Sequence, residues 1–349
     1  MAANKLTRGP IIVSQTLTSM KRNMRRLAVK LGLPPTAEAD VNDRLAPEAG
    51  RRCIEDGPVA VDQDAFANAM RDTDNYIGTN PGRREYMDNN VPRLYRVFKN
   101  MLQNGVNLHG PTPDVASGGG VLYPVIRKHL PALLPYHVAE MHPCDLTIDG
   151  EKIPGCQFEC DKDVLKYDDH TFGAVLFCDT LEHLIVDPVW SLLEFNRVLK
   201  PGGHVVIATP NAAAVYRARN LFHGLSPATE NAIKPVSIYQ RHNREYTADE
   251  LEKLLHCAGF GECRFSTNDS MLSKRDLAML STAQAQGWLS RPFREFGPEL
   301  FFVAQKVAHK TLDDNLSEEQ RWPAWLYTSY ENYHKRPKIF PIVVGEDYA

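Results

Sequence analysis

Three consecutive glycines, Gly118 to Gly120, follow a short apolar stretch that carries one acid, Asp114. Glycine destabilises the interior of a strand or helix, so a run of three indicates a loop with a purpose. The pattern predicts a strand before this run and a helix after it, so backbone amides there can approach a ligand closely. The dinucleotide-binding pattern G-x-G-x-x-G/A is met only in part, because Tyr123 occupies the third position. The pattern therefore disfavours an NAD-dependent activity.

A second acid, Glu140, stands at the predicted end of the next strand. A carboxylate at the end of a second strand can accept two hydrogen bonds from the diol of a ribose. The alternative interpretation is a surface glutamate without such a role. The glycine run and this acid together form the first candidate binding site.

The segment DTLEHL places Asp179, Glu182 and His183 at a predicted strand end and in the turn that follows. Two carboxylates and an imidazole suit Mg2+ or Mn2+, with water completing the coordination shell. In a second interpretation no metal is bound and His183 is the general base. In a third, Glu182 and His183 only form a common turn, and the imidazole bonds to the backbone.

Strands and helices alternate from about residue 110 onwards. The predicted strands are 112–117, 136–141, 172–179, 204–210 and 299–307, and the predicted helices are 91–105, 121–130, 187–203 and 246–260. Asp187 is expected to cap the third helix, and Gly202 and Gly203 are expected to end it. Thr247 and Glu250 form a capping box at the start of the fourth helix. The alternation predicts an α/β fold with ligands at the carboxyl ends of the strands.

The composition is that of an ordinary globular protein, with 43% hydrophobic and 24% charged residues and a net charge of -3. No basic field favours nucleic acid as a partner. The sequence predicts no membrane span, because no apolar run reaches roughly 18 residues. It predicts no signal peptide, because the N-terminus has too short an apolar core and no small-residue cleavage site. Seven scattered cysteines without a CxxC pair disfavour a disulfide framework or a zinc cluster. A cytoplasmic location is therefore expected.

Five motifs, in this order and spacing, resemble those of the class I S-adenosylmethionine-dependent methyltransferases. Within that family, they resemble the broad group that includes sugar, ubiquinone and small-molecule O-methyltransferases. The motifs are DVASGGG, VAEM, CDKDVLKYDDHTFGAVLFCDTLEHL, DPVWSLLEFNRVLKPGGHVVIATPN and HNREYTADELEKLLHCAGF. The resemblance implies a Rossmann-like, mostly parallel seven-stranded sheet flanked by helices. It also implies S-adenosylmethionine as cofactor and S-adenosylhomocysteine as product. The chain departs from the pattern in three places: Ala116 replaces a usual glycine, Gly173 replaces a usual aspartate, and the run before Asp114 is proline-rich where the family has an apolar strand.

The resemblance covers residues 110–265 and 299–307, which leaves long flanks. It divides the chain into a mainly helical N-terminal extension or lid at 1–105 and a cofactor-binding core at 106–310. The core contains an insertion at about 267–298, and an aromatic-rich extension follows at 311–349. The stretch 34–60, rich in Pro, Ala and Asp, is predicted to be a loop. The C-terminal aromatics favour packing or a subunit interface in a homo-oligomer.

The resemblance implies roles for the residues that match its motifs. The cofactor-binding residues would be Asp114, Ala116, Ser117, Gly118, Gly120, Glu140, Asp161, Lys162 and Cys178. Of these, Glu140 would hold the ribose hydroxyls and Asp161 the adenine amino group. The catalytic candidates are His183, Asp179 and His242. The metal candidates are Asp179, Glu182 and His183, because a subgroup of quinone methyltransferases has a similar E-x-x-E-H that holds a divalent cation.

The segment after the fifth core strand often covers the acceptor pocket in this family. Acceptor contacts are therefore expected from Asn211, Arg244 and Tyr246. Alternatively, Arg244 forms a structural ion pair and Tyr246 packs. The leading prediction is methyl transfer to a hydroxyl of a small-molecule or glycan acceptor: a sugar, glycoconjugate or polar natural product. A quinone or aromatic O- or N-methyltransferase, and a cofactor-binding partner protein without activity, are the other hypotheses.

Overall fold

The computed structural model describes residues 51–71, 81–142, 146–228, 239, 241–268, 272–289 and 291–310. The predicted C-terminal extension at 311–349 lies outside these residues. So does the predicted N-terminal extension before residue 51. In the described ranges, no helix combines the length and the apolar character needed to cross a membrane.

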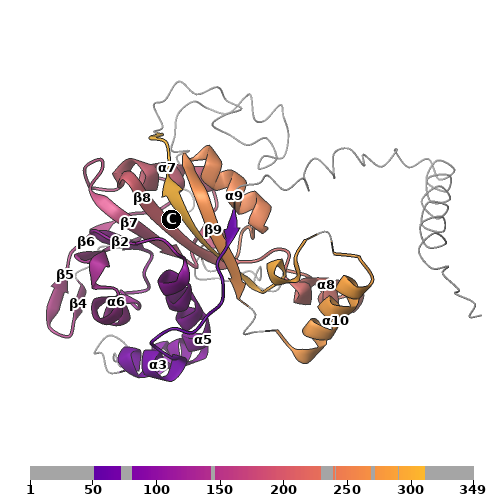
Figure 1. Cartoon of the computed structure of the whole chain (residues 1–349). Helices are drawn as coiled ribbons and strands as arrows, with labels where there is room; N and C mark the ends of the chain where they lie inside the picture. The colour runs from indigo at the N-terminus through magenta and orange to yellow at the C-terminus, as the bar shows by residue number, and fades with distance from the viewer. Residues whose placement is uncertain are drawn as a thin grey trace, which may run out of the picture. The chain divides into compact units, whose positions relative to one another are not determined.

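A mostly parallel sheet of eight strands organises the described chain (Figure 1). Its order is β1-β9-β10-β8-β7-β2-β3-β6, and β10 runs antiparallel to both of its neighbours. The strands are β1 (Arg52–Cys53), β2 (Thr112–Val115), β3 (Tyr136–Glu140), β6 (Gly155–Gln157), β7 (Phe172–Cys178), β8 (Leu199–Pro210), β9 (Phe260–Asn268) and β10 (Glu299–Lys306). A separate hairpin pairs β4 (Leu146–Ile148) with β5 (Glu151–Ile153). The predicted Rossmann-like α/β fold is thus confirmed.

The eighth strand, β1, is the element that the sequence analysis did not predict. Arg52 and Cys53 pair in parallel with Arg264 and Phe265 of β9. These two residues lie in the stretch 34–60 that was predicted to be a loop, and a two-residue strand is too short to show a period of two. The described sheet therefore has eight strands rather than the predicted seven.

Helices cover both faces of the sheet (Figure 1). They are α3 (Gln63–Arg71), α5 (Pro81–Gln103), α6 (Tyr123–His129), α7 (Pro188–Val198), α8 (Val215–Phe222), α9 (Ala248–Cys257) and α10 (Lys274–Ala285). Short 3-10 turns occur at η1 (Pro131–Leu133), η2 (Leu181–His183) and η4 (Phe293–Glu295). Helix α5 belongs to the same compact unit as the sheet.

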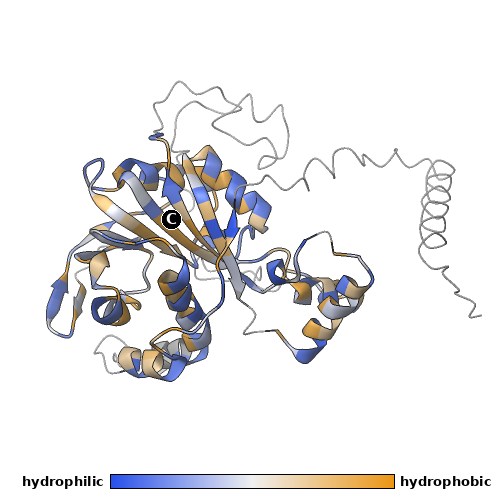
Figure 2. Ribbon diagram, in the orientation of Figure 1, coloured by the Kyte–Doolittle hydropathy of each residue, from blue (hydrophilic) through white to orange (hydrophobic). Residues whose placement is uncertain are grey.

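Each face of the sheet has its own hydrophobic core, because side chains alternate along a strand. In β7, Val175 and Phe177 pack with α7 and α9, whereas Ala174 and Leu176 pack with α3, α5 and α6. All four of these side chains are fully buried. The central strands accordingly appear largely hydrophobic in Figure 2, while the helices carry hydrophilic residues as well.

The helix caps agree with the sequence, but the end of α7 does not. Asp187 accepts a hydrogen bond of 2.8 Å from the Val189 amide, and Thr247 and Glu250 form the predicted capping box of α9. Helix α7 ends at Val198, and Gly202 lies inside β8 instead of ending the helix. The predicted helix end at the glycine pair was therefore wrong by about one turn.

Gly173 shows why this chain departs from the usual aspartate. A Cβ atom added there would lie 1.9 Å from the carbonyl oxygen of His109 and 3.0 Å from the Cα of Gly110. No side chain fits such an approach of two backbones. The segment before β2 therefore packs directly against the start of β7.

Candidate active site

The strand order places the candidate site at the carboxyl ends of β2 and β7. Neighbouring strands of the large sheet stand in the order β6-β3-β2-β7-β8. Along the chain, β2 comes first, β3 and β6 follow on one side of it, and β7 and β8 follow on the other side. The direction of winding reverses between β2 and β7, and ligands of such sheets bind in the crevice outside this reversal point. Two cavities open there, of about 310 Å³ and about 180 Å³. They share Ala116, after β2, and Asp179, after β7, so they adjoin.

The glycine run begins at the wall of the larger cavity, which Gly118 lines. Gly118, Gly119 and Gly120 all have positive φ, at 62°, 83° and 72°. A Cβ atom on Gly120 would also lie 2.9 Å from Ile148 and Leu146. The three residues thus adopt left-handed backbone conformations, which residues with a Cβ atom rarely adopt. This explains why three glycines stand in a row.

Glu140 is held against this loop from the end of β3. Its Oε1 accepts a 2.5 Å hydrogen bond from the Ser117 hydroxyl and a 3.3 Å bond from the Gly119 amide. The same hydroxyl oxygen accepts a bond of 2.7 Å from the Gly120 amide. The structure therefore joins the two parts of the first predicted binding site, the glycine run and the acid.

Ala116 and Asp179, the two residues shared by the cavities, both have left-handed backbone conformations. Their φ angles are 54° and 52°, which residues other than glycine rarely adopt. Each such residue costs about 1–3 kcal/mol and is kept where the surrounding structure requires it. Two of the five non-glycine residues with positive φ in the described ranges thus lie at the junction of the two cavities.

Asp114 lines the larger cavity from β2 and is almost completely buried. Its carboxylate accepts a short hydrogen bond from the Tyr136 hydroxyl. Burial raises the pKa of Asp114 to about 7, although the bond from Tyr136 favours the ionised form. Cys178 lines the same cavity, and burial raises the pKa of its thiol well above the usual value.

Arg93 is a cavity residue that the sequence analysis missed. It extends from α5, and its Nη1 lies 2.7 Å from Oδ1 of Asp179. It lines the larger cavity beside Asp114, Ser117 and Gly118. One arginine on a helix outside the matched motifs carries no signal in a single sequence, because only the fold brings α5 to this edge of the sheet.

The smaller cavity contains the predicted adenine contact, Asp161. Its carboxylate oxygens accept bonds from the backbone amides of Ile185, Val186 and Asp187, at 3.0 to 3.4 Å. Burial nevertheless raises the pKa of Asp161. Oδ2 accepts only the bond from Ile185 among these, so it retains a lone pair for a ligand. The neighbouring Lys162 pairs instead with Glu159 at 2.7 Å and belongs to neither set of cavity residues.

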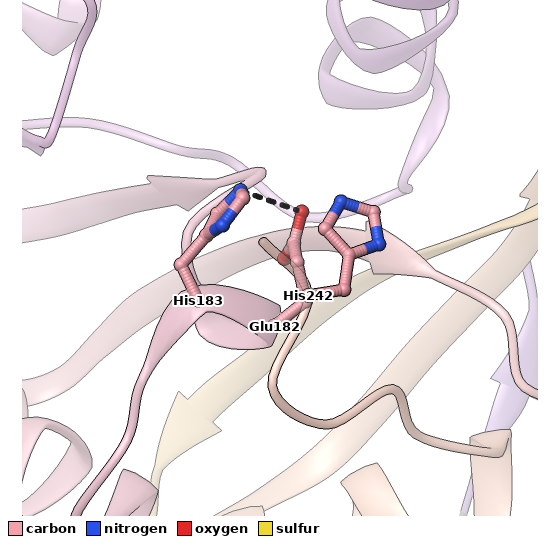
Figure 3. Close-up of side chains that lie close together, drawn as sticks. All are labelled: Glu182, His183 and His242. Atoms are coloured by element: carbon pink, nitrogen blue, oxygen red, sulfur yellow. Dashed lines mark ion pairs between the residues drawn. The ribbon is translucent and has the colours of Figure 1, made fainter. Parts of the chain in front are cut away.

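Three predicted functional side chains meet in one cluster, formed by Glu182, His183 and His242 (Figure 3). One potential ligand atom from each lies within 4.8 Å of the others. The Nε2 atom of His183 is 3.8 Å from Oε1 of Glu182, and the two imidazole rings are 5.0 Å apart between centroids. His183 also lines the smaller cavity. The structure therefore adds His242, rather than Asp179, to Glu182 and His183.

Hydrogen bonds fix both imidazole rings of the cluster. His183 Nδ1 lies 3.0 Å from the carbonyl oxygen of Arg241, which can only accept, so Nδ1 donates. His242 Nδ1 lies 2.7 Å from Oε1 of Glu245. In a neutral ring that donates through Nδ1, the Nε2 lone pair is available to a proton or a cation. His183 can thus make the predicted backbone contact through Nδ1 and still act as a base through Nε2.

Glu182 is the buried member of the cluster, with 1% of its surface exposed. Burial raises its pKa to about 8, and the nearby charge of Asp179 acts in the same direction. The hydroxyl of Thr209 donates a bond of 2.9 Å to Oε2 and favours the ionised form. A carboxyl group with such a pKa can hold or release a proton near neutral pH.

The three residues predicted to contact the acceptor all make contacts within the fold. The side-chain amide of Asn211 donates to the carbonyl oxygens of Glu295 and Gly297, and the residue is fully buried. Tyr246 is 2% exposed and packs in the core with α9. Arg244 pairs with Glu250 at 3.0 Å. Both amide hydrogens of Asn211 are thus donated within the fold, and the ring of Tyr246 is buried, while the acceptor role of these residues stays a prediction.

Comparison with known proteins agrees with this geometry. A family model described as a methyltransferase domain matches residues 108–261. No curated protein matches the sequence. Among solved structures, a chain from the complex between the Haloferax volcanii Trm112 methyltransferase activator and a methyltransferase is 15% identical, with a TM-score of 0.43. The similarity covers 72% of the present chain and 100% of that chain.

Two further solved structures show similarity at the same low level. A SAM dependent methyltransferase from Archaeoglobus fulgidus is 15% identical over 67% of this chain and 97% of that chain, with a TM-score of 0.40. The Burkholderia thailandensis 1,6-didemethyltoxoflavin-N1-methyltransferase is 14% identical over 73% and 94%, with a TM-score of 0.38. The family match shows that residues 108–261 are similar to a methyltransferase domain, and the strand order around the two cavities is that of a Rossmann-like α/β sheet.

Proposed function

We propose that the protein transfers the methyl group of S-adenosylmethionine to a hydroxyl of a polar small molecule, such as a sugar, a glycoconjugate or a polar natural product. The observation that carries this proposal is the cluster of Glu182, His183 and His242, in which His183 lines the smaller cavity. A hydroxyl is a poor nucleophile near neutral pH and needs a base, whereas an amine does not need one to the same degree.

The two cavities fit the two ends of the cofactor. The larger cavity offers Arg93 for the carboxylate of the methionine end and Asp114 for its ammonium group. Glu140 would exchange its bond with Ser117 for bonds to the ribose diol. The smaller cavity, with Asp161 and the apolar ring of Phe158, would hold the adenine. This arrangement brings the sulfonium to the junction marked by Ala116 and Asp179.

Methyl transfer is then a direct displacement. The acceptor oxygen forms a bond to the methyl carbon as the carbon–sulfur bond breaks, and S-adenosylhomocysteine leaves as a neutral thioether. Because the sulfonium is already a good leaving group, the protein mainly has to align the two reactants. His183 Nε2 accepts the hydroxyl proton, and the ionised form of Glu182, whose Oε1 lies 3.8 Å away, stabilises the resulting imidazolium.

The same cluster also has the donors of a divalent-cation site. Glu182 Oε1 and the ring nitrogens of His183 and His242 form a set of two imidazoles and one carboxylate, which suits Mn2+ better than Mg2+. The bonds from Nδ1 to Arg241 and Glu245 are the outer contacts that metal-binding histidines usually make. A bound cation would lower the pKa of the acceptor hydroxyl, in place of a general base.

Calorimetric titration with S-adenosylmethionine, followed by methyl-transfer assays, tests the proposal. Polyols, sugars and glycosides are compared with quinols and amines as acceptors, with and without Mn2+. His183→Ala should abolish transfer to hydroxyls even at concentrations that saturate the protein with S-adenosylmethionine, because His183 also lines the smaller cavity and its loss can change cofactor affinity. His109→Ala is the matched control, because His109 is exposed and precedes β2, at the opposite edge of the sheet. Transfer to amines alone, or full activity of His183→Ala without metal, would contradict the proposal.

A further inference from the structure

A second cluster of potential ligands lies outside the active site, between α9 and β9. Glu252 and His256 are one helical turn apart on α9, so both side chains lie on the same face of the helix. Cys263 lies on β9, and one ligand atom from each of the three residues lies within 4.8 Å of the others. None of the three lines either cavity of the active site.

An incomplete set of contacts at Glu252 points to a ligand. The residue is 3% exposed, and its Oε2 accepts a bond of 2.9 Å from Nη1 of Arg51. Its Oε1 is buried and has no hydrogen-bond partner among the residues that the structure describes. Leaving a buried carboxylate oxygen without a partner is costly. The missing partner must be a donor or a cation.

We propose that Glu252 Oε1, an imidazole nitrogen of His256 and the Cys263 sulfur bind a zinc-class divalent cation. This inference goes beyond the methyl transfer proposed above and does not depend on it. Carboxylate, imidazole and thiolate are the ligands of protein-bound zinc, whereas a sulfur ligand disfavours Mg2+ and Ca2+. His256 is only half-buried, so water can complete a tetrahedral shell from that side.

The charges around the cluster can accommodate the ion. Arg51 is held by Asp249, Glu252 and Glu295, and Arg291 also binds Asp249. Three carboxylates against two guanidinium groups leave one negative charge. On binding, the cation replaces the Cys263 thiol proton, which passes to solvent, so the thiolate supplies a second negative charge. The two charges balance a divalent ion.

Such an ion would cross-link two elements of the sheet edge. Helix α9 packs on the face where Cys263 is buried, and β9 pairs with β1. A bound cation would tie the last turn of α9 to β9 directly. Its effect would be on the stability of this edge and not on the chemistry at Glu182 and His183.

Cobalt substitution of the full-length protein tests the site, because a cobalt–thiolate bond gives a charge-transfer band in the near ultraviolet. One equivalent of Co2+ per chain should produce this band, and Zn2+ should displace it. His256→Ala and Cys263→Ala should each abolish the band. Loss of a ligand should weaken binding by more than the about 10- to 100-fold that loss of an outer contact costs.

Two variants serve as controls. Cys257→Ala removes the thiol at the end of α9 and should leave the band intact. His183→Ala disrupts the active-site cluster and should also leave the band intact. His256→Ala decides the result if Cys263→Ala does not fold, because His256 is half-exposed. The absence of a thiolate band in folded wild-type protein would overturn the proposal. A band that survives in either ligand variant would also overturn it.

Discussion

Replacing Arg93 with alanine should weaken the binding of S-adenosylhomocysteine while leaving that of 5′-methylthioadenosine unchanged. The two ligands share the adenosine and the thioether, but only the first carries an amino-acid carboxylate. Arg93 lines the larger cavity beside the glycine loop, where the methionine end is proposed to bind. Because Arg93 extends from α5, this prediction also tests whether the helix before the matched domain takes part in cofactor binding.

The expected loss follows from the environment of the guanidinium. A hydrogen bond to a charged group contributes about 1.5–3 kcal/mol, which corresponds to about 10- to 150-fold in affinity. Arg93 is 22% exposed and already pairs with Asp179 at 2.7 Å, so solvent and a second carboxylate share its charge. We therefore expect the lower half of the range, about 10- to 40-fold for S-adenosylhomocysteine.

Calorimetric titration of both ligands measures the effect, with Arg96→Ala as the matched control. Arg96 lies on the same helix but pairs with Asp56, away from the glycine loop. Its removal should change neither affinity. An equal loss for both ligands in Arg93→Ala would show a structural effect on the cavity and refute the assignment. Unchanged affinity for S-adenosylhomocysteine would refute it as well.

Three further predictions concern the ribose contact, a buried acid and a packed glycine. Glu140→Ala should weaken S-adenosylhomocysteine and 5′-methylthioadenosine alike, by about 10-fold or more in calorimetry, because both carry the ribose; a loss confined to one ligand would contradict this. Glu182 binds a proton in the folded state that the unfolded state releases between pH 4.5 and about 8, so its contribution makes stability fall as pH rises through that window. Glu182→Gln should remove this dependence of the unfolding free energy on pH, as measured by urea unfolding. Relative to the wild type, the variant should therefore gain about 2–5 kcal/mol of unfolding free energy between pH 4 and pH 9. The same pH dependence in both proteins would disprove the prediction. Gly173→Ala, whose Cβ would lie 1.9 Å from the His109 carbonyl oxygen, should cost at least about 1–3 kcal/mol of unfolding free energy. In Gly57→Ala the added Cβ meets Gln103 at 3.5 Å, an ordinary contact, so this control should change stability by about 0.5 kcal/mol or less.

The elements that the sequence predicted correctly are those with a strong local pattern. Buried parallel strands such as β7 are continuous apolar runs, and the caps at Asp187 and Thr247 depend on residues only two or three positions away. The glycine loop was readable for the same reason, since its left-handed path needs glycine at successive positions. The two-residue strand β1 has no such pattern, and neither does the switch from α7 to β8.

The candidate site was only partly predictable, because its side chains meet through tertiary structure. The loop that carries His242 is held against Glu182 and His183 by contacts such as the bond from Asn243 to the His183 carbonyl oxygen, across 60 residues. Asn211 was predicted to contact the acceptor because polar groups at strand ends often bind substrates. In the structure its side-chain amide donates both hydrogens to backbone carbonyl oxygens near η4. The spacing of residues along the sequence predicts that their side chains lie close together only if one helix, strand or turn carries all of them.

The antiparallel strand β10 has a consequence for how the chain reaches its final state. It is the last described strand, yet it lies between β8 and β9 and pairs with both along most of their length. Until it is inserted, the newly synthesised sheet presents two long edges whose amide and carbonyl groups lack partners. Exposed edges of this kind pair readily with other chains and lead to aggregation. A protein truncated before residue 299 would therefore be lost to aggregation, even though it retains every residue of the two cavities.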